Sequence, residues 1–556
     1  MKNRTLSIVC LFLIAMNCSL LMGNNHPTPV LKDKYKIKMT EARMKYNEQD
    51  YNGALRIYRE IYDANKTDAK LNYMMGMCYF YIGSKDESIK YFETAQKLDP
   101  KIDKDLPLAL GQCYQFIGEL DKALEQFNKY RANLNPKKMK TDEVTQFIDQ
   151  CMTAKELMSK PVNVTFKNLG KDVNSEFDDA VPSLSADGKT LIFTSRRPDT
   201  EGGGIDPNTG LYYDDIYYTT WDDEKGKWKP ADGIPGNLNT VGHDACMSIS
   251  PDGSMIFVYR NIDKVTGSGD IYYSTRKADG NWGTPVDIGK PINSTYFESS
   301  ACLSPDGNTL YFISERPGGE GNADIWSSTK LNGVWQKPVN LGKNINTIED
   351  ELGVFMHPDG KTLFFTSKGH RNMGGYDVFM SRYVNGKWIG PFNMGYPINT
   401  TKDETHFILS TDGTKAYVSS RRDGGLGGLD IYEIDMTNYV WPVIDSAIAV
   451  KDTNKIVVPK NTFKPELSIL KGSIIDGNTG QKLSGDVVIA DANSIKDAVT
   501  ISTNASGEYF ITLKGDKEYI ITIEKHGYKK YSDKVMLPLG EKKTYTLDKL
   551  IVLDKE

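Results

Sequence analysis

The repeated phrase that decides the fold is clearest at residues 351–394, which read ELGVFMHPDGKTLFFTSKGHRNMGGYDVFMSRYVNGKWIGPFNM. A Pro-Asp-Gly turn precedes an aromatic strand, and a glycine-rich loop then leads to Asp-Val-Phe, the local form of Asp-Ile-Tyr. Asn385-Gly386 follows as a hairpin turn of the kind that matches the twist of paired strands. The segment therefore predicts four short antiparallel strands.

This phrase returns five times between Val162 and Trp441. Its Asp-Gly pairs begin at Asp187, Asp252, Asp306, Asp359 and Asp412, and its Asp-Ile-Tyr positions at Asp215, Asp270, Asp324, Asp377 and Asp430. From the second unit on, the period is 53 to 54 residues. An asparagine precedes each Asp-Gly by 13 residues, at Asn174, Asn239, Asn293, Asn346 and Asn399. Strand-rich units of this period predict a β-propeller.

The ends of the repeat region predict how the ring closes. Val162 to Gly170 reads like the end of a fourth strand and comes before the first unit, while the last unit fades after Asp430. We therefore expect the N-terminal strand to complete the last of five blades, which removes an open sheet edge. Six blades is the alternative, because Trp441 keeps the 53-residue phase from Trp388. The phrases resemble the PD40, or WD40-like, repeats of TolB-type and related periplasmic proteins, over about 280 residues.

Residues 35 to 136 carry three phrases of a helical repeat. The second is the clearest, with Met75-Gly76, Tyr79, Gly83, Ser88, Phe92, Ala95 and Pro100 at the expected offsets. Ala54, Ser88 and Ala123 recur 34 and 35 residues apart, where small side chains let paired helices approach closely. The region is similar to the tetratricopeptide repeat family, which implies a curved stack that holds a peptide or a partner helix. Alternatively, the three repeats serve mainly as a packing platform. In either case a further helix at about Thr141 to Met158 is expected to cap the array.

The first 23 residues read as an export signal. Lys2 and Arg4 precede an apolar run from Leu6 to Met22, which is short for the alternative, a membrane anchor. Cleavage near Gly23 and lipidation at Cys18, in a loose lipoprotein box, are both open. In either case we expect the mature chain to leave the cytoplasm.

Composition limits the classes of function. A chain of 556 residues is too long for one core, and a net charge of −5 gives no reason to expect nucleic acid. The cysteines beyond the export signal are odd in number and scattered, which predicts buried packing rather than disulfides or a zinc site: Cys78, Cys113, Cys151, Cys246 and Cys302. No hydrolase, zinc-protease or phosphate-loop motif occurs. We therefore expect a non-enzymatic protein with no cofactor and no metal.

The predicted binding residues lie on the propeller face that carries the glycine-rich loops. The first of these loops is ten residues longer than the other four, and an insertion in one loop of one face is typical of a binding surface. Tyrosine and arginine are favoured interface anchors. The hypothesis names Arg196, Arg197, Tyr212, Tyr213, Arg316, Arg371, Arg421 and Arg422 as contacts for a protein partner. The alternative is that the arginines pair internally with acidic crossovers.

The predicted domain boundaries are an export signal at 1–23, helical repeats at 34–160, a propeller at 161–443, a linker at 444–466 and a small β-sandwich at 467–556. The last domain looks like the carboxypeptidase regulatory-like module, which carries no peptidase chemistry, on phrases such as Gly472 to Asp476 and Thr503 to Tyr509. Asp445-Ser446-Ala447, in the linker, matches a short O-glycosylation sequon of Bacteroidota.

The order of these modules resembles the PorE-type periplasmic component of the type IX secretion and gliding apparatus of Bacteroidota. That resemblance implies a scaffold at the inner side of the outer membrane that docks on secretion components. The family adds an OmpA-like domain that grips peptidoglycan, and without one at Glu556 we do not expect peptidoglycan binding. A glycan-binding propeller and a TolB-like envelope protein are the alternatives.

Overall fold

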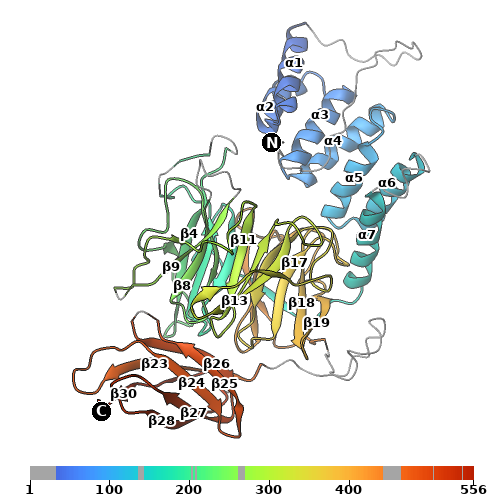
Figure 1. The fold of residues 1–556 in the computed structure, drawn as a ribbon. Coiled ribbons are helices and arrows are strands. Elements are labelled where there is room, and N and C mark those ends of the chain that lie inside the picture. The colour runs from blue at the N-terminus through green and yellow to red at the C-terminus, as the bar shows by residue number, and fades with distance from the viewer. Residues whose placement is uncertain are drawn as a thin grey trace. The chain divides into compact units, whose positions relative to one another are not determined.

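Helices come first along the chain and strands follow (Figure 1). The computed structural model describes residues 33–134, 143–201, 204–206, 210–260, 269–277, 279–442, 465–504, 506–540 and 543–556. The predicted export signal with Cys18 and most of the predicted linker, with its sequon, lie outside these residues. The chain divides into two units between Cys113 and Tyr114.

The described helices pair as the repeat pattern predicts. Their bounds are α1 (Asp33–Asn47), α2 (Tyr51–Tyr62), α3 (Ala69–Tyr81), α4 (Lys85–Leu98), α5 (Leu106–Phe116), α6 (Leu120–Ala132) and α7 (Val144–Met158). The carboxylates of Asp50 and Asp68 accept backbone N–H bonds at the starts of α2 and α3, which is the usual way to satisfy these donors. The predicted final helix is confirmed as α7.

The small residues of the repeat are required by close packing. At Gly76, an added Cβ would lie 2.5 Å from the ring of Phe92, so α3 and α4 approach over a bare backbone. Ala54, Ser88 and Ala123 are fully buried, as predicted from their spacing. All five described cysteines are buried thiols.

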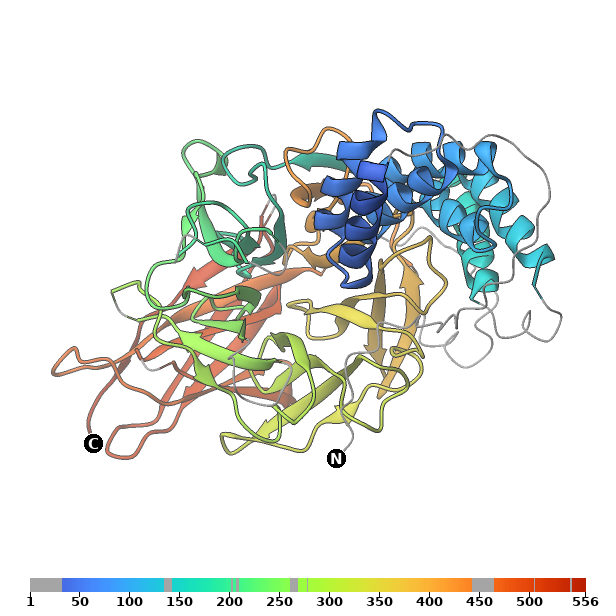
Figure 2. The same cartoon turned by 90° about the horizontal axis from the view of Figure 1, so that it is seen from above.

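The region from 165 to 435 forms five antiparallel sheets, whose strands follow the sequence repeats (Figure 2). Sheet one contains β2 (Asp179–Leu184), β3 (Thr190–Ser195), β4 (Asp215–Asp222) and β5 (Lys227–Trp228), with β6 (Asp232–Gly233) also on β4. Sheet two contains β7 (Asp244–Ile249), β8 (Met255–Arg260), β9 (Asp270–Thr275) and β10 (Val286–Asp287). Sheet three contains β11 (Glu298–Leu303), β12 (Thr309–Ser314), β13 (Asp324–Leu331) and β14 (Val334–Trp335), with β15 (Val339–Asn340) also on β13. Sheet four contains β16 (Glu351–Met356), β17 (Thr362–Ser367), β18 (Asp377–Val384) and β19 (Lys387–Asn393). Sheet five contains β20 (Glu404–Leu409), β21 (Lys415–Ser420), β22 (Asp430–Asp435) and β1 (Thr165–Asn168).

The predicted closing strand is confirmed. β1 pairs antiparallel with β22, from Thr165 opposite Asp435 to Asn168 opposite Tyr432. Trp441 does not supply this strand, and its side chain is instead buried against Phe364 and Tyr439. The first strands of the five sheets contact one another in the cyclic order β2, β7, β11, β16, β20 and back to β2. The β-rich region is therefore propeller-like.

The repeated asparagines explain the fixed spacing. The side-chain amide of Asn346 accepts a bond of 2.8 Å from the N–H of Ile325 and donates one of 3.0 Å to its C=O. The other four asparagines bond the equivalent residue in the third strand of their own preceding sheet: Asn174 to Ile431, Asn239 to Ile216, Asn293 to Ile271 and Asn399 to Val378. Each crossover is thus tied to the sheet it leaves, and buried backbone groups near the start of the third strand are satisfied.

Residues 467–556 form two more sheets. The first contains β26 (Glu508–Lys514), β23 (Leu467–Asp476) and β29 (Tyr545–Asp548), with β30 (Ile551–Leu553) also on β23. The second contains β25 (Ser494–Ser502), β24 (Asp486–Asp491), β27 (Lys517–Ile523) and β28 (Tyr531–Leu537). Leu470 and Ile551 of the first sheet share one apolar cluster with Ile489 and Ile521 of the second.

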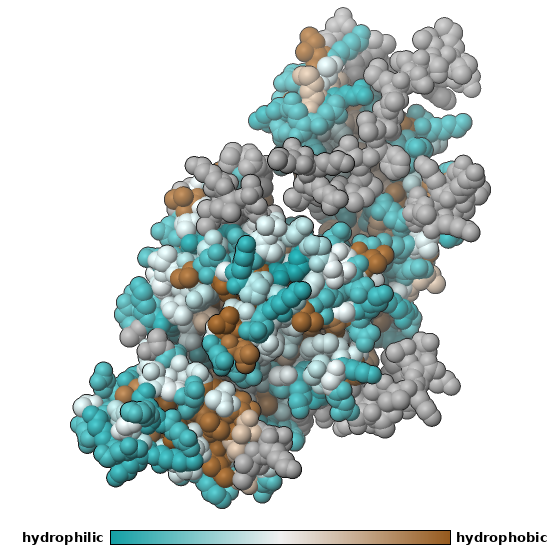
Figure 3. Space-filling view, in the orientation of Figure 1, coloured by the Kyte–Doolittle hydropathy of each residue, from teal (hydrophilic) through white to brown (hydrophobic). Residues whose placement is uncertain are grey.

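No helix within the described ranges is long and apolar enough to cross a membrane. On the face drawn in Figure 3, hydrophilic side chains predominate and the hydrophobic ones form small separate patches.

Candidate functional site

One face of α3 carries aromatic and basic side chains that are exposed or half-buried, and Tyr73 and Phe80 on this face also contact the ring of Phe92. Lys70, Tyr73, Met77 and Phe80 are spaced three to four residues apart, and Tyr81 follows Met77 by four, so the five side chains line one side of the helix. The other side, with residues such as Leu71, Met75 and Cys78, is fully buried in the helical core. We call the five side chains the α3 stripe.

The α3 stripe combines π faces with positive charge. The Lys70 ammonium lies 4.6 Å from the ring centroid of Tyr73, and the Lys85 ammonium lies 5.4 Å from that of Phe80. Burial lowers the pKa of Lys70, whereas Asp103 acts in the opposite direction. Burial is also the main cause that raises the pKa of Tyr73. Such a surface suits a segment with apolar side chains and acidic groups.

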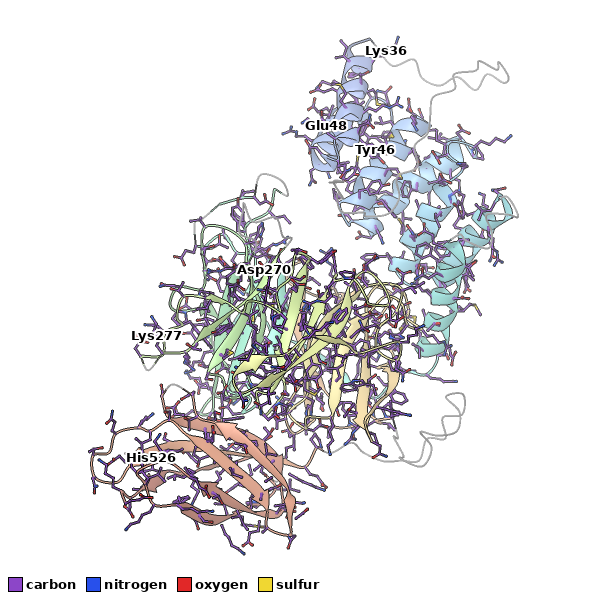
Figure 4. All side chains as sticks on the ribbon, viewed as in Figure 1. Lys36, Tyr46, Glu48, Asp270, Lys277 and His526 are labelled. Carbon is purple, nitrogen blue, oxygen red and sulfur yellow. The ribbon has the colours of Figure 1, made fainter. Side chains whose placement is uncertain are left out.

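Three tyrosines extend this surface across neighbouring helices. The rings of Tyr51 and Tyr81 stack at 4.7 Å, and Tyr46 meets both edge-on at 5.3 and 6.1 Å (Tyr46 is labelled in Figure 4). Tyr81 nevertheless stays 50% exposed. The repeat pattern marks only packing positions, so these residues were not singled out from the sequence. The signal that could have found them is the aromatic stripe at helical spacing in α3.

Three of the predicted partner-binding arginines are used inside the protein. Arg197 pairs with Asp179 at 2.8 Å, Arg316 with Glu298 at 3.1 Å and Arg422 with Glu404 at 3.9 Å. Each guanidinium also donates to a crossover carbonyl, and the side chains are only 12 to 15% exposed. Arg260 pairs with Asp244 in the same way in sheet two. We call this arrangement the arginine brace.

Sheet four departs from this arrangement. His370 stands near the place of the arginine and contacts the carbonyl of Ile345 at 2.8 Å. Glu351 is 1% exposed and accepts bonds from Thr347 and Ser367, but no described Lys or Arg pairs with it. Burial consequently raises the pKa of Glu351 to about 8. Arg371 points elsewhere and pairs with Glu156 of α7.

The structure gathers Arg196, Tyr212, Tyr213 and Arg421 around the long first loop. Tyr212 meets Phe177 edge-on at 5.4 Å, and Tyr213 meets His243 at 4.8 Å. Arg196 pairs with Asp214 at 2.7 Å, and Arg421 lies 3.8 Å from Asp178. These four predicted residues therefore lie around the same loop, whereas Arg371 does not.

No arrangement for metal or glycan chemistry stands out. Within the described part of the chain, no three His, Cys, Asp or Glu side chains are grouped to hold a metal ion. A narrow cavity at the first strands is lined by small and apolar residues such as Ser183, Ser248, Cys302 and Met356. Its described lining holds one aromatic ring, Phe355, and no carboxylate.

Comparison with known proteins supports the helical repeat. Residues 69–102 match the family described as Tetratricopeptide repeat, as predicted for the second repeat. No curated protein matches the chain.

Among solved structures, the chain is similar to the type III secretion translocator chaperone SycD of Yersinia enterocolitica, with 18% identity, a TM-score of 0.20, and coverage of 22% of this chain and 87% of that chain. SycD in complex with a peptide of the translocator YopD is similar at 17% identity and a TM-score of 0.21, over 23% and 98% of the two chains. The 3-chlorocatechol 1,2-dioxygenase of Rhodococcus opacus 1CP is similar at 11% identity and a TM-score of 0.14, over 16% and 60%. Likenesses this slight carry no argument about function.

Proposed function

We propose that this protein is a non-enzymatic scaffold that binds other proteins, and that the α3 stripe is one of its binding surfaces. The observation that carries the proposal is the face of α3 within a tetratricopeptide repeat, on which Lys70 and Tyr81 are exposed and Tyr73 and Phe80 are half-buried. Stacked repeats present continuous surfaces of this kind to extended partners. Aromatic side chains supply large contact areas at little entropic cost.

We further infer that the β-rich region is a five-bladed propeller and that residues 467–556 form a β-sandwich. The cyclic contacts of the five first strands and the pairing of β1 with β22 support the propeller. The apolar cluster shared by the two last sheets supports the sandwich.

The same proposal places the protein in the periplasm, at the inner side of the outer membrane, within type IX secretion or gliding machinery. It rests on the export signal and on the order of the three modules in the sequence. A lipid at Cys18 belongs to this proposal. A TolB-like envelope role is the second candidate, because it has the same propeller phrases.

The test is co-purification from cross-linked, detergent-solubilised envelopes of cells that produce the full chain. Lys70→Glu with Tyr81→Ser should deplete the partners that bind the α3 stripe. Lys97→Glu with Leu98→Ser, which makes the same two kinds of change at exposed sites on α4, serves as the matched control. Quantitative mass spectrometry of the eluates should show loss only in the first variant.

Three outcomes separate the candidates. Type IX components in the wild-type eluate support the proposal, Tol–Pal proteins favour the second candidate, and polysaccharide machinery overturns both. An unchanged partner set in the α3 variant would remove the α3 stripe from the proposal.

A further inference from the structure

The described residues on the two sides of the inserted first loop pair with each other, and we call this paired stem the arm. Ile205 and Tyr212 form an antiparallel bridge, and the N–H of Asp206 donates to the carbonyl of Leu211 at 2.8 Å. The N–H of Gly210 donates in turn to the carbonyl of Asp206, also at 2.8 Å. The described residues of the insertion therefore have a hairpin-like backbone.

The arm is held at its base from two sides. Tyr212 packs against Phe177, which lies in the crossover that enters sheet one. Tyr213 packs against His243, which lies in the crossover to sheet two and contacts Asp214 at 2.7 Å. His243 also lies 3.6 Å from Asp206 of the arm itself. Fixed packing at the base lowers the entropy that a partner must remove on binding.

The described residues of the arm and of the neighbouring loops display apolar side chains. Ile205 is 54% exposed and Leu211 is 47% exposed, next to the bridge that orders them. Val241, two residues before His243, is 78% exposed. Leu426 is 38% exposed and adjoins Gly427, whose backbone lies against Phe177. We call these four side chains the insertion surface.

The charges around the insertion surface are mainly negative. The nearby arginines are already matched, Arg196 by Asp214 and Arg421 by Asp178. Three further carboxylates in the same loops, those of Glu176, Glu201 and Asp423, are exposed. From Arg196 to Asp215 the chain carries two arginines and five acidic residues. Complementary potentials steer association and select partners.

We infer that the insertion surface is a second binding site, and that its occupant is a protein segment with apolar side chains flanked by lysine or arginine. The apolar side chains would bury against Ile205 and Leu211, while the basic ones face the carboxylates of Glu176 and Glu201. Arg196 and Arg421 pair with Asp214 and Asp178, so we assign the anchoring role to the apolar side chains. This site shares no residue with the α3 stripe.

Two short labelled peptides of equal length test the inference by fluorescence anisotropy with the full chain. One peptide alternates leucine with lysine, and the other alternates leucine with glutamate. We expect the leucine–lysine peptide to bind more tightly, with an affinity that falls as salt rises. Ile205→Ser with Leu211→Ser should weaken this binding by about tenfold, as loss of interface anchors does.

Matched variants make the result decisive. Leu331→Ser with Val334→Ser removes a directly paired apolar couple, 62 and 63% exposed, from the hairpin of sheet three and should bind the peptide like the wild type. Glu176→Lys with Glu201→Lys should shift the preference toward the leucine–glutamate peptide. Lys70→Glu with Tyr81→Ser should leave both peptide titrations unchanged. The result for the insertion surface therefore does not depend on whether the α3 stripe binds a partner. Equal binding of the two peptides, or equal weakening by the sheet-three control, would overturn the inference.

Discussion

Glu351→Gln should stabilise the β-rich region at neutral and alkaline pH. Glu351 occupies the position that in four other sheets is paired with an arginine, yet it is buried without one. Glutamine has nearly the shape of the protonated acid. Its carbonyl can accept from the N–H of Thr347, and its NH₂ can donate to the hydroxyls of Thr347 and Ser367.

The magnitude follows from the displaced titration. Burial raises the pKa of Glu351 from 4.5 to about 8, so between these values the folded protein holds a proton that the unfolded chain releases. Stability therefore falls as pH rises through this window, by about 1.4 kcal/mol per pH unit. The full window corresponds to about 5 kcal/mol, of which about 3 kcal/mol has been lost at neutral pH. Glutamine does not titrate, so the variant should lack this slope.

Tryptophan fluorescence during urea unfolding measures the effect in the right part of the chain. All 7 tryptophans lie between Trp221 and Trp441, so the helical repeats and residues 467–556 do not contribute to the signal. Unfolding free energies of wild type and Glu351→Gln should converge near about pH 5 and separate progressively toward about pH 8.

Glu298→Gln in sheet three is the matched control. It removes a buried carboxylate that Arg316 pairs with, and the guanidinium is then left buried without its counter-ion. We expect a loss of about 3 kcal/mol instead of a gain. The reasoning fails if both glutamine variants change stability in the same direction, or if the gain at Glu351 does not grow with pH.

Two further predictions concern the packing of the repeats. Asn346→Ala should cost the β-rich region about 2 kcal/mol in urea unfolding, because the buried N–H of Ile325 loses its acceptor, while the C=O of Ile325 keeps the bond from the N–H of Leu341. Asn344→Ala, which removes only an exposed bond to the carbonyl of Trp388, should be nearly neutral, and equal losses would contradict the role of the repeated asparagines. Gly76→Ala should destabilise the helical repeats by about 1 to 3 kcal/mol in thermal unfolding followed by circular dichroism, because its Cβ would meet Phe92 at 2.5 Å. Met77→Ala, at the next and half-buried position, should destabilise the helical repeats less than Gly76→Ala. A larger loss for Met77→Ala would show that the packing of α3 against α4 does not require a residue without a Cβ at position 76.

Local periodic signals let the sequence predict the order of elements. The small residues at positions such as Ser88 recur because two helices must approach there, and this requirement is repeated in each helix pair. The asparagines keep a fixed distance from each Asp-Gly turn because each one bonds the preceding sheet. The closing role of β1 was predictable because its residues match a fourth strand that the last unit lacks.

The fate of individual side chains depended on tertiary structure. Arg196 and Arg197 are neighbours in sequence, but Arg197 turns inward to buried Asp179 while Arg196 pairs with half-buried Asp214. Successive side chains of an extended backbone point to opposite sides. Two adjacent arginines in the sequence therefore do not show which of them forms the ion pair inside the protein.

The sequence by itself thus determined the helical repeats, the strand units and their order, because each depends on contacts that recur at a fixed spacing. Only the tertiary structure decided that sheet four buries Glu351 without an arginine, that the insertion stands as an arm on Phe177 and His243, and that α3 shows an aromatic face. These features arise where residues distant in sequence meet once, and a contact that is made once leaves no period in the sequence.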